Sequence, residues 1–264
     1  MTGEASTGEV STGEVQALAR AWVEQSTRIV VMTGAGISTD SVIPYFRGPK
    51  GVWTKNPAAE KTATLSHYLG DPEVRRVVWQ QRLVSPAWTA VPNAGHRAVT
   101  ALHEQGKLLA VVTQNIDELH QRAGLPDDRV VEVHGTMRRY RCWSCDDEGP
   151  MELMLERVRA GEPDPACALC GGVVKSATIS FGQALVPEVI DRALALAEQC
   201  DLFVAAGTSL QVYPAAYALP RAKASGARTL IVNAEPTKMD AVADLVVRGS
   251  ISVLLPELFG GSVS

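Results

Sequence analysis

Four of the five cysteines stand in two closely spaced pairs. Two residues separate the members of each pair and 21 residues separate the pairs, which are Cys142 with Cys145 and Cys167 with Cys170. In a reducing compartment such pairs indicate thiolate metal ligands rather than disulfides. Four thiolates complete a tetrahedral zinc site and leave no position for water, so the predicted zinc is structural. The alternative is four unligated thiols. Cys200 stands alone, and we interpret it as a small buried residue at a helix end.

A glycine-rich turn follows an apolar, β-branched run at residues 28–32. Its sequence is Gly34-Ala35-Gly36-Ile37-Ser38, and a complete G-x-G-x-x-G pattern fails because Thr39 stands at the last position. Glycines and backbone N–H groups at the start of a helix suit the pyrophosphate of a dinucleotide. The turn therefore predicts a dinucleotide site, and a tight strand-to-helix turn without a ligand is the alternative.

Polar residues follow three other predicted strands. They form the segments Thr113-Gln114-Asn115-Ile116-Asp117, Gly207-Thr208-Ser209 and Asn233-Ala234-Glu235. Open α/β sheets bind ligands beyond the carboxyl ends of their strands, so we expect these segments to line one site. Within it, Asn233 and Glu235 are candidates for binding an adenosine ribose, because acidic residues after a strand often take that role.

One histidine is a candidate general base. His134 follows the apolar run that ends at Val133 and precedes Gly135. Histidine titrates near neutral pH and is the side chain most often used to move protons in catalysis. A buried structural histidine is the alternative. The other histidines, at positions 67, 96, 103 and 120, lie in helical or loop patterns and are interpreted as structural.

These residues need a scaffold that brings the ends of several strands together. Short apolar runs predict the strands, at residues 28–32, 108–112, 202–205, 229–232 and 245–247. Helical patterns separate most of them, at residues 94–105, 187–198 and 215–225. This alternation predicts an α/β fold with a doubly wound, Rossmann-like parallel sheet. The large domain is assigned residues 15–43, 93–137 and 178–258.

Two stretches interrupt the alternation and predict a smaller lobe inserted into the larger one. Residues 44–92 are rich in Pro and Trp with helical patches, and residues 138–177 carry the cysteine pairs and a helical pattern at 151–159. A cleft between two lobes is a common ligand site. Residues 1–14 repeat a Thr-Gly-Glu unit that buries too little apolar surface to order, so we expect a disordered tail there and a first helix from about Val15.

Composition narrows the class of protein. The chain has 264 residues, 46% hydrophobic and 20% charged, with a net charge of −4 and 5% aromatic residues. Such a chain can bury a sizeable core, and it lacks the basic surface and the stacking aromatics of a nucleic-acid binder. No apolar run is long enough for a membrane span and no signal peptide opens the chain, so we expect a cytoplasmic protein with no membrane partner. These patterns specify no oligomeric state.

Taken in order, the segments resemble those of sirtuins, which are NAD-dependent protein-lysine deacylases. The resemblance covers residues 15–258 and is nearest to the bacterial zinc-containing members. It rests on the glycine turn, Pro44 with Phe46-Arg47-Gly48, the Gln114 to Asp117 segment, His134-Gly135, the four cysteines, Gly207-Thr208-Ser209-Leu210 and the Asn233 to Glu235 segment.

The resemblance implies a role for each matching residue. His134 would be the catalytic base that activates a ribose hydroxyl, and Asn115 and Asp117 would be catalytic residues in the nicotinamide and ribose pocket. The remaining NAD contacts would come from Gly34, Ala35, Gly36, Ser38, Phe46, Arg47, Gln114, Ile116, Gly207, Thr208, Ser209, Asn233, Glu235 and Ile251. The co-substrates would be NAD and an acyl-lysine protein or peptide. The products would be deacylated lysine, nicotinamide and O-acyl-ADP-ribose, and one zinc would be structural.

Three positions depart from the family pattern. The family usually has Asp where Tyr45 stands, and usually has Gly where Val42 and Glu118 stand. A phenol is bulkier than a carboxylate and lacks its charge at neutral pH. Two alternatives to the deacylase therefore stay open, namely an ADP-ribosyltransferase or NAD hydrolase with the same pocket, and an NAD-binding sensor in which Tyr45 slows turnover.

Overall fold

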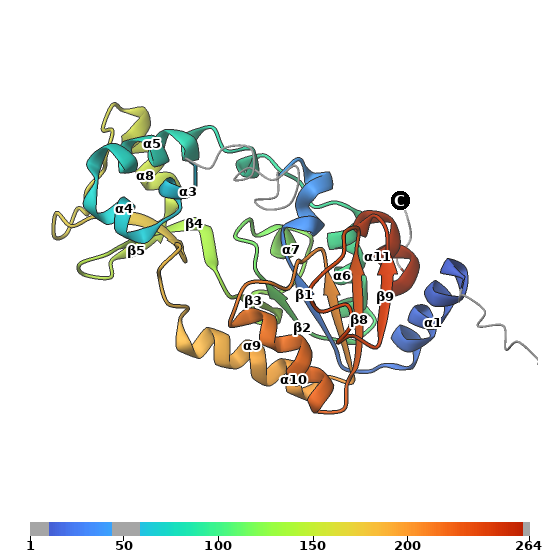
Figure 1. Ribbon diagram of the computed structural model, residues 1–264. Coiled ribbons are helices and arrows are strands. Elements are labelled where there is room, and N and C mark those ends of the chain that lie inside the picture. The colour runs from blue at the N-terminus through green and yellow to red at the C-terminus, as the bar shows by residue number, and fades with distance from the viewer. Residues whose placement is uncertain (1–10, 44–58, 261–264) are drawn as a thin grey trace, which may run out of the picture.

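A six-stranded parallel sheet forms the centre of the larger lobe (Figure 1). The computed structural model describes residues 11–43 and 59–260, and all statements below concern these. The strand order is β3-β2-β1-β7-β8-β9. The strands are β1 (Ile29–Thr33), β2 (Leu108–Thr113), β3 (Val130–Glu132), β7 (Leu202–Ala206), β8 (Arg228–Asn233) and β9 (Leu245–Arg248). The predicted doubly wound α/β fold is confirmed, and the order reverses beside β1, where such folds bind ligands.

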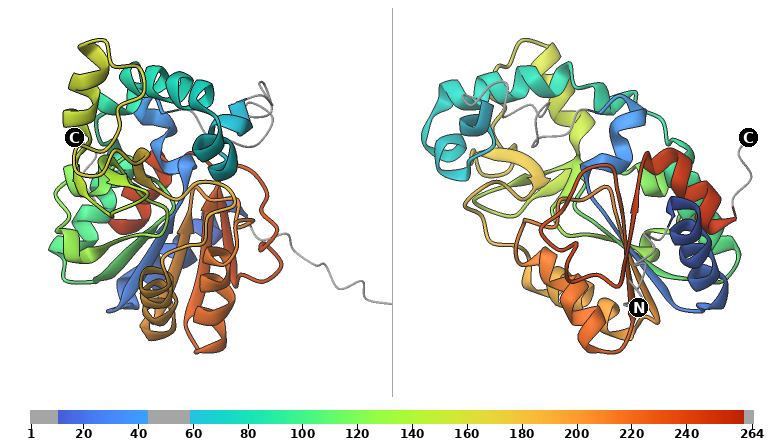
Figure 2. Two further views of the ribbon diagram at one scale, coloured as in Figure 1. Left: turned by 90° about the vertical axis from the view of Figure 1, so that its left-hand side faces the viewer. Right: turned by 45° about the vertical axis from the view of Figure 1, so that its right-hand side comes forward.

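Helices cover both faces of this sheet, which explains the continuous apolar runs of its central strands. Every residue of β1 and β7 is buried, and successive side chains enter opposite cores. One core includes side chains of α1 (Thr12–Gln25), α6 (Ala94–Glu104) and α11 (Ile251–Phe259). The other includes side chains of α9 (Pro187–Gln199) and α10 (Ala218–Ala224), and Figure 2 shows these two helices on the opposite side of the sheet. Cys200 is buried at the end of α9, as predicted.

The first helix begins at Thr12, three residues before the predicted boundary at Val15. Ser11 caps it: its hydroxyl accepts from the Glu14 backbone N–H, and the Glu14 carboxylate accepts from the Ser11 backbone. This reciprocal capping box satisfies two N–H groups that a helix start otherwise leaves unpaired. The last Ser-Thr-Gly-Glu unit of the repeat is therefore the start of the helix, and the expected tail over residues 1–10 lies outside the described residues.

The two insertions pack together as a small lobe beside the sheet (Figure 1). From the first come α3 (Ala59–Thr62), α4 (Leu65–Gly70), α5 (Pro72–Leu83) and the 3₁₀ helix η2 (Pro86–Trp88). From the second come α8 (Met151–Arg159) and an antiparallel sheet of β5 (Glu148–Pro150), β4 (Gly135–Cys142) and β6 (Val174–Thr178). They share a core in which Trp79 of α5 is fully buried with Met154 and Leu155 of α8. The sequence did not predict this sheet, which extends slightly beyond the expected boundaries of 138 and 177.

Short elements follow the strands at the edge where the site residues lie. The glycine turn after β1 continues into a 3₁₀ helix, η1 (Ala35–Ser41), rather than an α-helix. A four-residue helix, α7 (Leu119–Arg122), follows β2, and the 3₁₀ helices η3 (Asp127–Arg129) and η4 (Ala215–Tyr217) precede β3 and α10. Among the described residues, no helix combines the length and apolar character that a membrane crossing requires.

Candidate functional site

Side chains from three strand ends meet at the carboxyl edge of the sheet. The Gln114 amide N–H donates to Thr208 Oγ1 at 2.7 Å, which joins the ends of β2 and β7. The Asn115 amide donates to Gly34 O at 3.1 Å and to Ser38 Oγ at 3.0 Å, which joins β2 to the turn after β1. The structure therefore brings together the glycine turn, the Gln114 to Asp117 segment and the Gly207 to Ser209 segment.

The glycines of this edge allow two turns to touch. The Gly36 N–H donates to Gly207 O at 2.8 Å. A Cβ on Gly36 would lie 2.7 Å from Gly207 Cα, and a Cβ on Gly207, whose φ is +64°, would lie 2.5 Å from the Ile37 nitrogen. Side chains at either position would push the turns apart. The glycines have a packing function here that is independent of any phosphate ligand, in agreement with the ligand-free alternative for this turn, and the sequence did not predict its contact with Gly207.

A buried hydrogen-bond network fixes Asp117. The Ser38 hydroxyl donates to Asp117 Oδ2 at 2.8 Å, and the Leu119 N–H donates to Oδ1 at 3.0 Å. Nε2 of His96 lies 3.5 Å from Ser38 Oγ. Burial raises the pKa of Asp117, and the hydrogen bonds from Leu119 and Ser38 oppose that rise. The carboxyl group is therefore held in one orientation and is linked through the Ser38 hydroxyl to the Asn115 amide.

His134 lies in the turn between β3 and β4, and its ring is oriented by the backbone. Nδ1 is 2.9 Å from Gln114 O, and a carbonyl only accepts, so Nδ1 carries the proton and Nε2 the lone pair. Burial lowers the pKa of His134, and the bond to Gln114 opposes this. The ring is neutral at neutral pH, which is the form a general base needs.

Gly135 explains why a glycine follows this histidine. Its φ is +69°, and a Cβ there would lie 2.0 Å from Ala177 O. The close approach lets β4 pair with β6, and the Ile179 N–H donates to His134 O at 2.8 Å. The segment that carries His134 is thus held by the large lobe on one side and by the sheet of the small lobe on the other.

The expected adenosine side lies at the ends of β8 and β9. The Asn233 amide donates to Glu235 O at 2.7 Å, and the Arg248 guanidinium donates to Glu235 O at 2.9 Å while pairing with Asp240. This loop is therefore organised by its own side chains. Ile251 is buried at the start of α11, and Ser209 follows Thr208 at the end of β7. Phe46 and Arg47, with Pro44 and Tyr45, lie outside the described residues.

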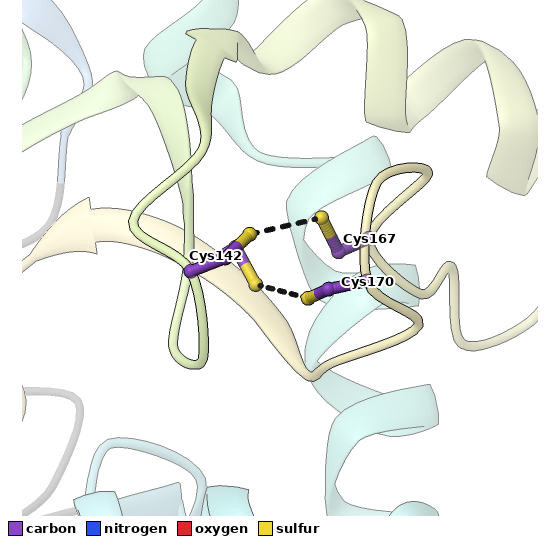
Figure 3. A group of neighbouring side chains, drawn as sticks. Cys142, Cys167 and Cys170 are labelled. Atoms are coloured by element: carbon purple, nitrogen blue, oxygen red, sulfur yellow. Dashed lines mark hydrogen bonds between the residues drawn. The ribbon is translucent and has the colours of Figure 1, made fainter.

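The four paired cysteines form a compact cluster in the small lobe (Figure 3). Their sulfur atoms all lie within 4.8 Å of one another, with 3.5 Å from Cys142 to Cys170 and 3.7 Å from Cys145 to Cys167. A tetrahedron with Zn–S bonds of about 2.3 Å has sulfur separations of about 3.8 Å. The cluster therefore fits one zinc ion, and none of the four thiols is in a disulfide.

The sequence predicted a structural role for two histidines that lie under the site, and the structure confirms it, although their contacts were not predicted. His96 is fully buried, caps the start of α6 by accepting from the Asn93 N–H, and contacts His120 with ring centroids 5.1 Å apart. Burial lowers the pKa of His96 to about 2 and that of His120 to about 4, so both rings are neutral. The spacing of Asn93 and His96, which fits a capping box, is the signal that was available for His96.

Fold and site together define an α/β protein with a ligand site at the carboxyl edge of its parallel sheet and a cysteine-rich inserted lobe. A model of the Sir2 family matches residues 34–214. The chain belongs to this family.

Two relatives are similar in sequence to this chain over nearly its whole length. The NAD-dependent protein deacetylase 2 of Streptomyces coelicolor is 50% identical over 233 residues, 88% of this chain and 97% of that protein. The NAD-dependent protein deacetylase 1 of Bradyrhizobium diazoefficiens is 41% identical, with coverage of 90% and 92%.

Solved structures show the same fold. One, from work on the mechanism and regulation of Sir2 enzymes, is 38% identical, with a TM-score of 0.84 and coverage of 95% of this chain and 98% of that one. Another is a Sir2 protein with a histidine-to-alanine substitution, together with a deacetylated p53 peptide and 3'-O-acetyl ADP-ribose. It is 30% identical, with a TM-score of 0.84 and coverage of 93% and 97%.

Proposed function

We propose that this chain is an NAD-dependent protein-lysine deacylase that releases nicotinamide and transfers the acyl group to ADP-ribose. The observation that supports it most is the neutral, backbone-oriented ring of His134. Through Gln114 it is linked to the edge that carries Asn115 and Asp117. The names of the relatives point to the same reaction.

Each residue at the edge takes a defined task in this proposal. Nε2 of His134 accepts the proton of a ribose hydroxyl, because Nδ1 is already committed to Gln114 O. Asp117 accepts hydrogen bonds from the nicotinamide carboxamide, and Asn115 keeps the glycine turn and Ser38 in place beside it. Gly207, Thr208 and Ser209 contact the phosphate side, and Asn233, Glu235 and Ile251 contact the adenosine.

The four cysteines hold one structural zinc. With four thiolates the coordination shell is complete, so the metal contributes folding energy to the small lobe and takes no part in the reaction. Cysteines kept as metal ligands need a reducing compartment, which supports the cytoplasm as the location. The acyl-lysine substrate is a protein or peptide, as in the solved Sir2 structures that contain a p53 peptide or a propionylated peptide.

One assay separates this function from its two alternatives. Purified protein is mixed with NAD and acyl-lysine peptides that differ in the acyl group, and nicotinamide and deacylated peptide are measured. A deacylase releases nicotinamide only when a suitable peptide is present, in equal amount to deacylated lysine. A hydrolase or ADP-ribosyltransferase releases it without deacylating the peptide, and a sensor releases almost none. Any of those last results would overturn the proposal.

The Tyr45→Asp variant in the same assay tests the sensor alternative directly. Asp is the residue that the family usually has at this position. If Tyr45 slows the reaction, the variant turns over faster than the natural protein with a similar NAD affinity. Equal or lower activity means that the tyrosine is adapted to this site.

A further inference from the structure

A buried polar cluster lies beneath the segment that carries Asn115 and Asp117, and it has none of the roles assigned above. It consists of Thr33 and Thr113, the last residues of β1 and β2, and His120 of α7. Their exposed fractions are 0%, 3% and 2%. Polar groups this deep destabilise a fold unless they are hydrogen-bonded, so their bonding pattern is informative.

The cluster forms a chain of hydrogen bonds. Thr33 and Thr113 are partners in the register of the parallel sheet, which places their hydroxyls side by side. Thr33 Oγ1 donates to Thr113 Oγ1 at 2.9 Å, and His120 Nε2 lies 2.9 Å from Thr33 Oγ1. Because the only proton of the Thr33 hydroxyl goes to Thr113, His120 must be the donor to Thr33.

The state of the histidine ring agrees with this direction. Nδ1 of His120 is buried and has no hydrogen-bond partner within the described residues. Burial keeps the ring neutral, with a pKa lowered to about 4, so it carries a single N–H. With the proton on Nε2, the unpartnered atom is a lone pair rather than an N–H group, and the one available proton makes a bond.

The chain ends at the backbone of the site. Thr113 Oγ1 also accepts the Asn115 backbone N–H at 3.1 Å. The Gln114 N–H donates to Thr33 O at 2.9 Å, and the Val133 N–H, one residue before His134, donates to Thr113 O at 3.0 Å. The Thr113 hydroxyl oxygen therefore accepts two hydrogen bonds, one from the Asn115 backbone N–H and one from the Thr33 hydroxyl. The Thr33 proton points to Thr113 because His120 donates to the oxygen of Thr33.

We propose that His120 is a positioning residue for the reaction, acting through Thr33 and Thr113 on the backbone of Asn115. The proposal rests on the function proposed above. Without the His120 donor, the Thr33 hydroxyl is free to turn its proton away from Thr113, and the peptide of Asn115 loses a fixed acceptor. Asn115 holds the glycine turn and Ser38, so a small displacement there reaches several groups that surround NAD.

The test compares variants that keep or remove the hydrogen bonds at matched size. His120→Gln retains an amide N–H close to the position of Nε2, whereas His120→Leu removes the donor. Thr33→Ser retains the hydroxyl, whereas Thr33→Val removes it and keeps the shape. His67→Gln, on the exposed surface of α4, is the control. Steady-state kcat and KM for NAD, the NAD dissociation constant and the melting temperature are measured on each full-length protein.

We expect His120→Leu and Thr33→Val each to lower kcat/KM for NAD by about tenfold or more. His120→Gln and Thr33→Ser should stay within about threefold of the natural protein, and the Leu and Val double variant should lose little more than either alone, because one break already interrupts the chain. The proposal is overturned if Gln and Leu behave alike, if the double variant is additive, or if only the melting temperature changes. A natural protein that deacylates no peptide would instead overturn the proposed function.

Discussion

The two polar centres of this molecule are built in opposite ways. At the carboxyl edge of the large sheet, Asn115, Gln114 and Thr208 meet because parallel strands end side by side, and each bond joins residues distant in sequence. In the small lobe, the sulfur atoms of four cysteines, from the end of β4, the turn after it and the segment before β6, lie within 4.8 Å of one another. The first centre is positioned by a large apolar core, whereas the geometry of the second fits a metal ion. We therefore expect the second centre to depend on a bound metal, and the two centres to respond differently when a single side chain is removed.

Loss of the metal should produce the largest effect and should fall on the small lobe. Cys142→Ala removes a buried ligand, and zinc binding in such modules is worth on the order of 10 kcal/mol or more of folding free energy. We expect about one zinc per natural chain, little in the variant, and loss of deacylation because β4 also positions His134. Metal analysis and thermal unfolding check this. Cys200→Ala, a buried thiol outside the cluster, should keep its zinc. Zinc-free natural protein would contradict the assignment.

Removal of the His134 side chain should leave the hydrophobic cores of both lobes intact and abolish most of the deacylation activity. His134→Ala should lower deacylation by about 10²- to 10⁴-fold, with little change in NAD affinity or melting temperature. Since burial lowers the pKa of His134, the acidic limb of the pH–rate profile of the natural enzyme should have its midpoint below the usual 6.5. Turnover and calorimetric NAD binding measure the two parts, with His67→Ala as control. Near-normal deacylation in the variant would remove His134 from its role.

The sequence could predict most elements of the large lobe because each carries its own pattern, but it did not predict β3 as a strand of the sheet or α11 as a helix. The apolar runs predicted at 28–32 and 108–112 lie within one residue of β1 and β2 at each end. In the small lobe, the helical pattern predicted at 151–159 matches α8 at both ends. The cysteine spacing predicted a cluster that the structure confirms, since its ligands are local. The antiparallel sheet was missed because β5 is only three residues long and because β4 and β6 carry charged or small residues that weaken alternation.

Site contacts that depend on register could not be read from the sequence. Nothing local indicates that Ser38 bonds to Asp117 or that His120 reaches Thr33, because the partners lie 79 and 87 positions apart. Val42 and Glu118 were noted as departures from glycine in the family pattern. The structure explains why glycine suits these two positions, because both residues have positive φ, of 63° and 58°.

The carboxyl group of Glu132, which is buried at the edge of the large lobe, should make the protein less stable as the pH rises. Most carboxyl groups, whose pKa is lowered by folding, have the opposite effect. Burial, with a contribution from Glu118, raises the pKa of Glu132 from 4.5 to about 7. The folded state therefore binds the proton more tightly than the unfolded state, so this group lowers the unfolding free energy as pH rises from 4.5 to 7. The difference of about 2.5 pKa units corresponds to at most about 3 kcal/mol.

The Glu132→Gln variant tests this directly. It should be more stable than the natural protein at pH 8 and similar below pH 4.5, as measured by urea unfolding across pH. Glu188→Gln, on the exposed start of α9, is the matched control and should leave the curve unchanged. Parallel stability curves for Glu132→Gln and the natural protein would show that the Glu132 carboxyl is solvated rather than buried.

The smallest expected effects concern two of the four described non-glycine residues with positive φ, Val42 and Glu118, whose side chains make different contacts. Val42 is 80% exposed, and its β-branched side chain strains a left-handed backbone. Val42→Gly relieves about 1–2 kcal/mol of backbone strain in the folded state. The freedom that glycine adds to the unfolded chain costs about 0.4–1 kcal/mol of stability, which leaves a net gain of about 0–1.6 kcal/mol. Glu118→Gly relieves a similar strain, but Glu118 Oε1 accepts the Thr136 hydroxyl at 2.7 Å, a bond that ties the segment after Asp117 to β4. A hydrogen bond to a charged group contributes about 1.5–3 kcal/mol, so we expect Glu118→Gly to be less stable than the natural protein.

Urea unfolding of Val42→Gly and Glu118→Gly measures this difference, with Val42→Ala as a control that keeps the Cβ. Equal shifts in the two glycine variants would mean that the Glu118 bond contributes nothing to holding the two segments together.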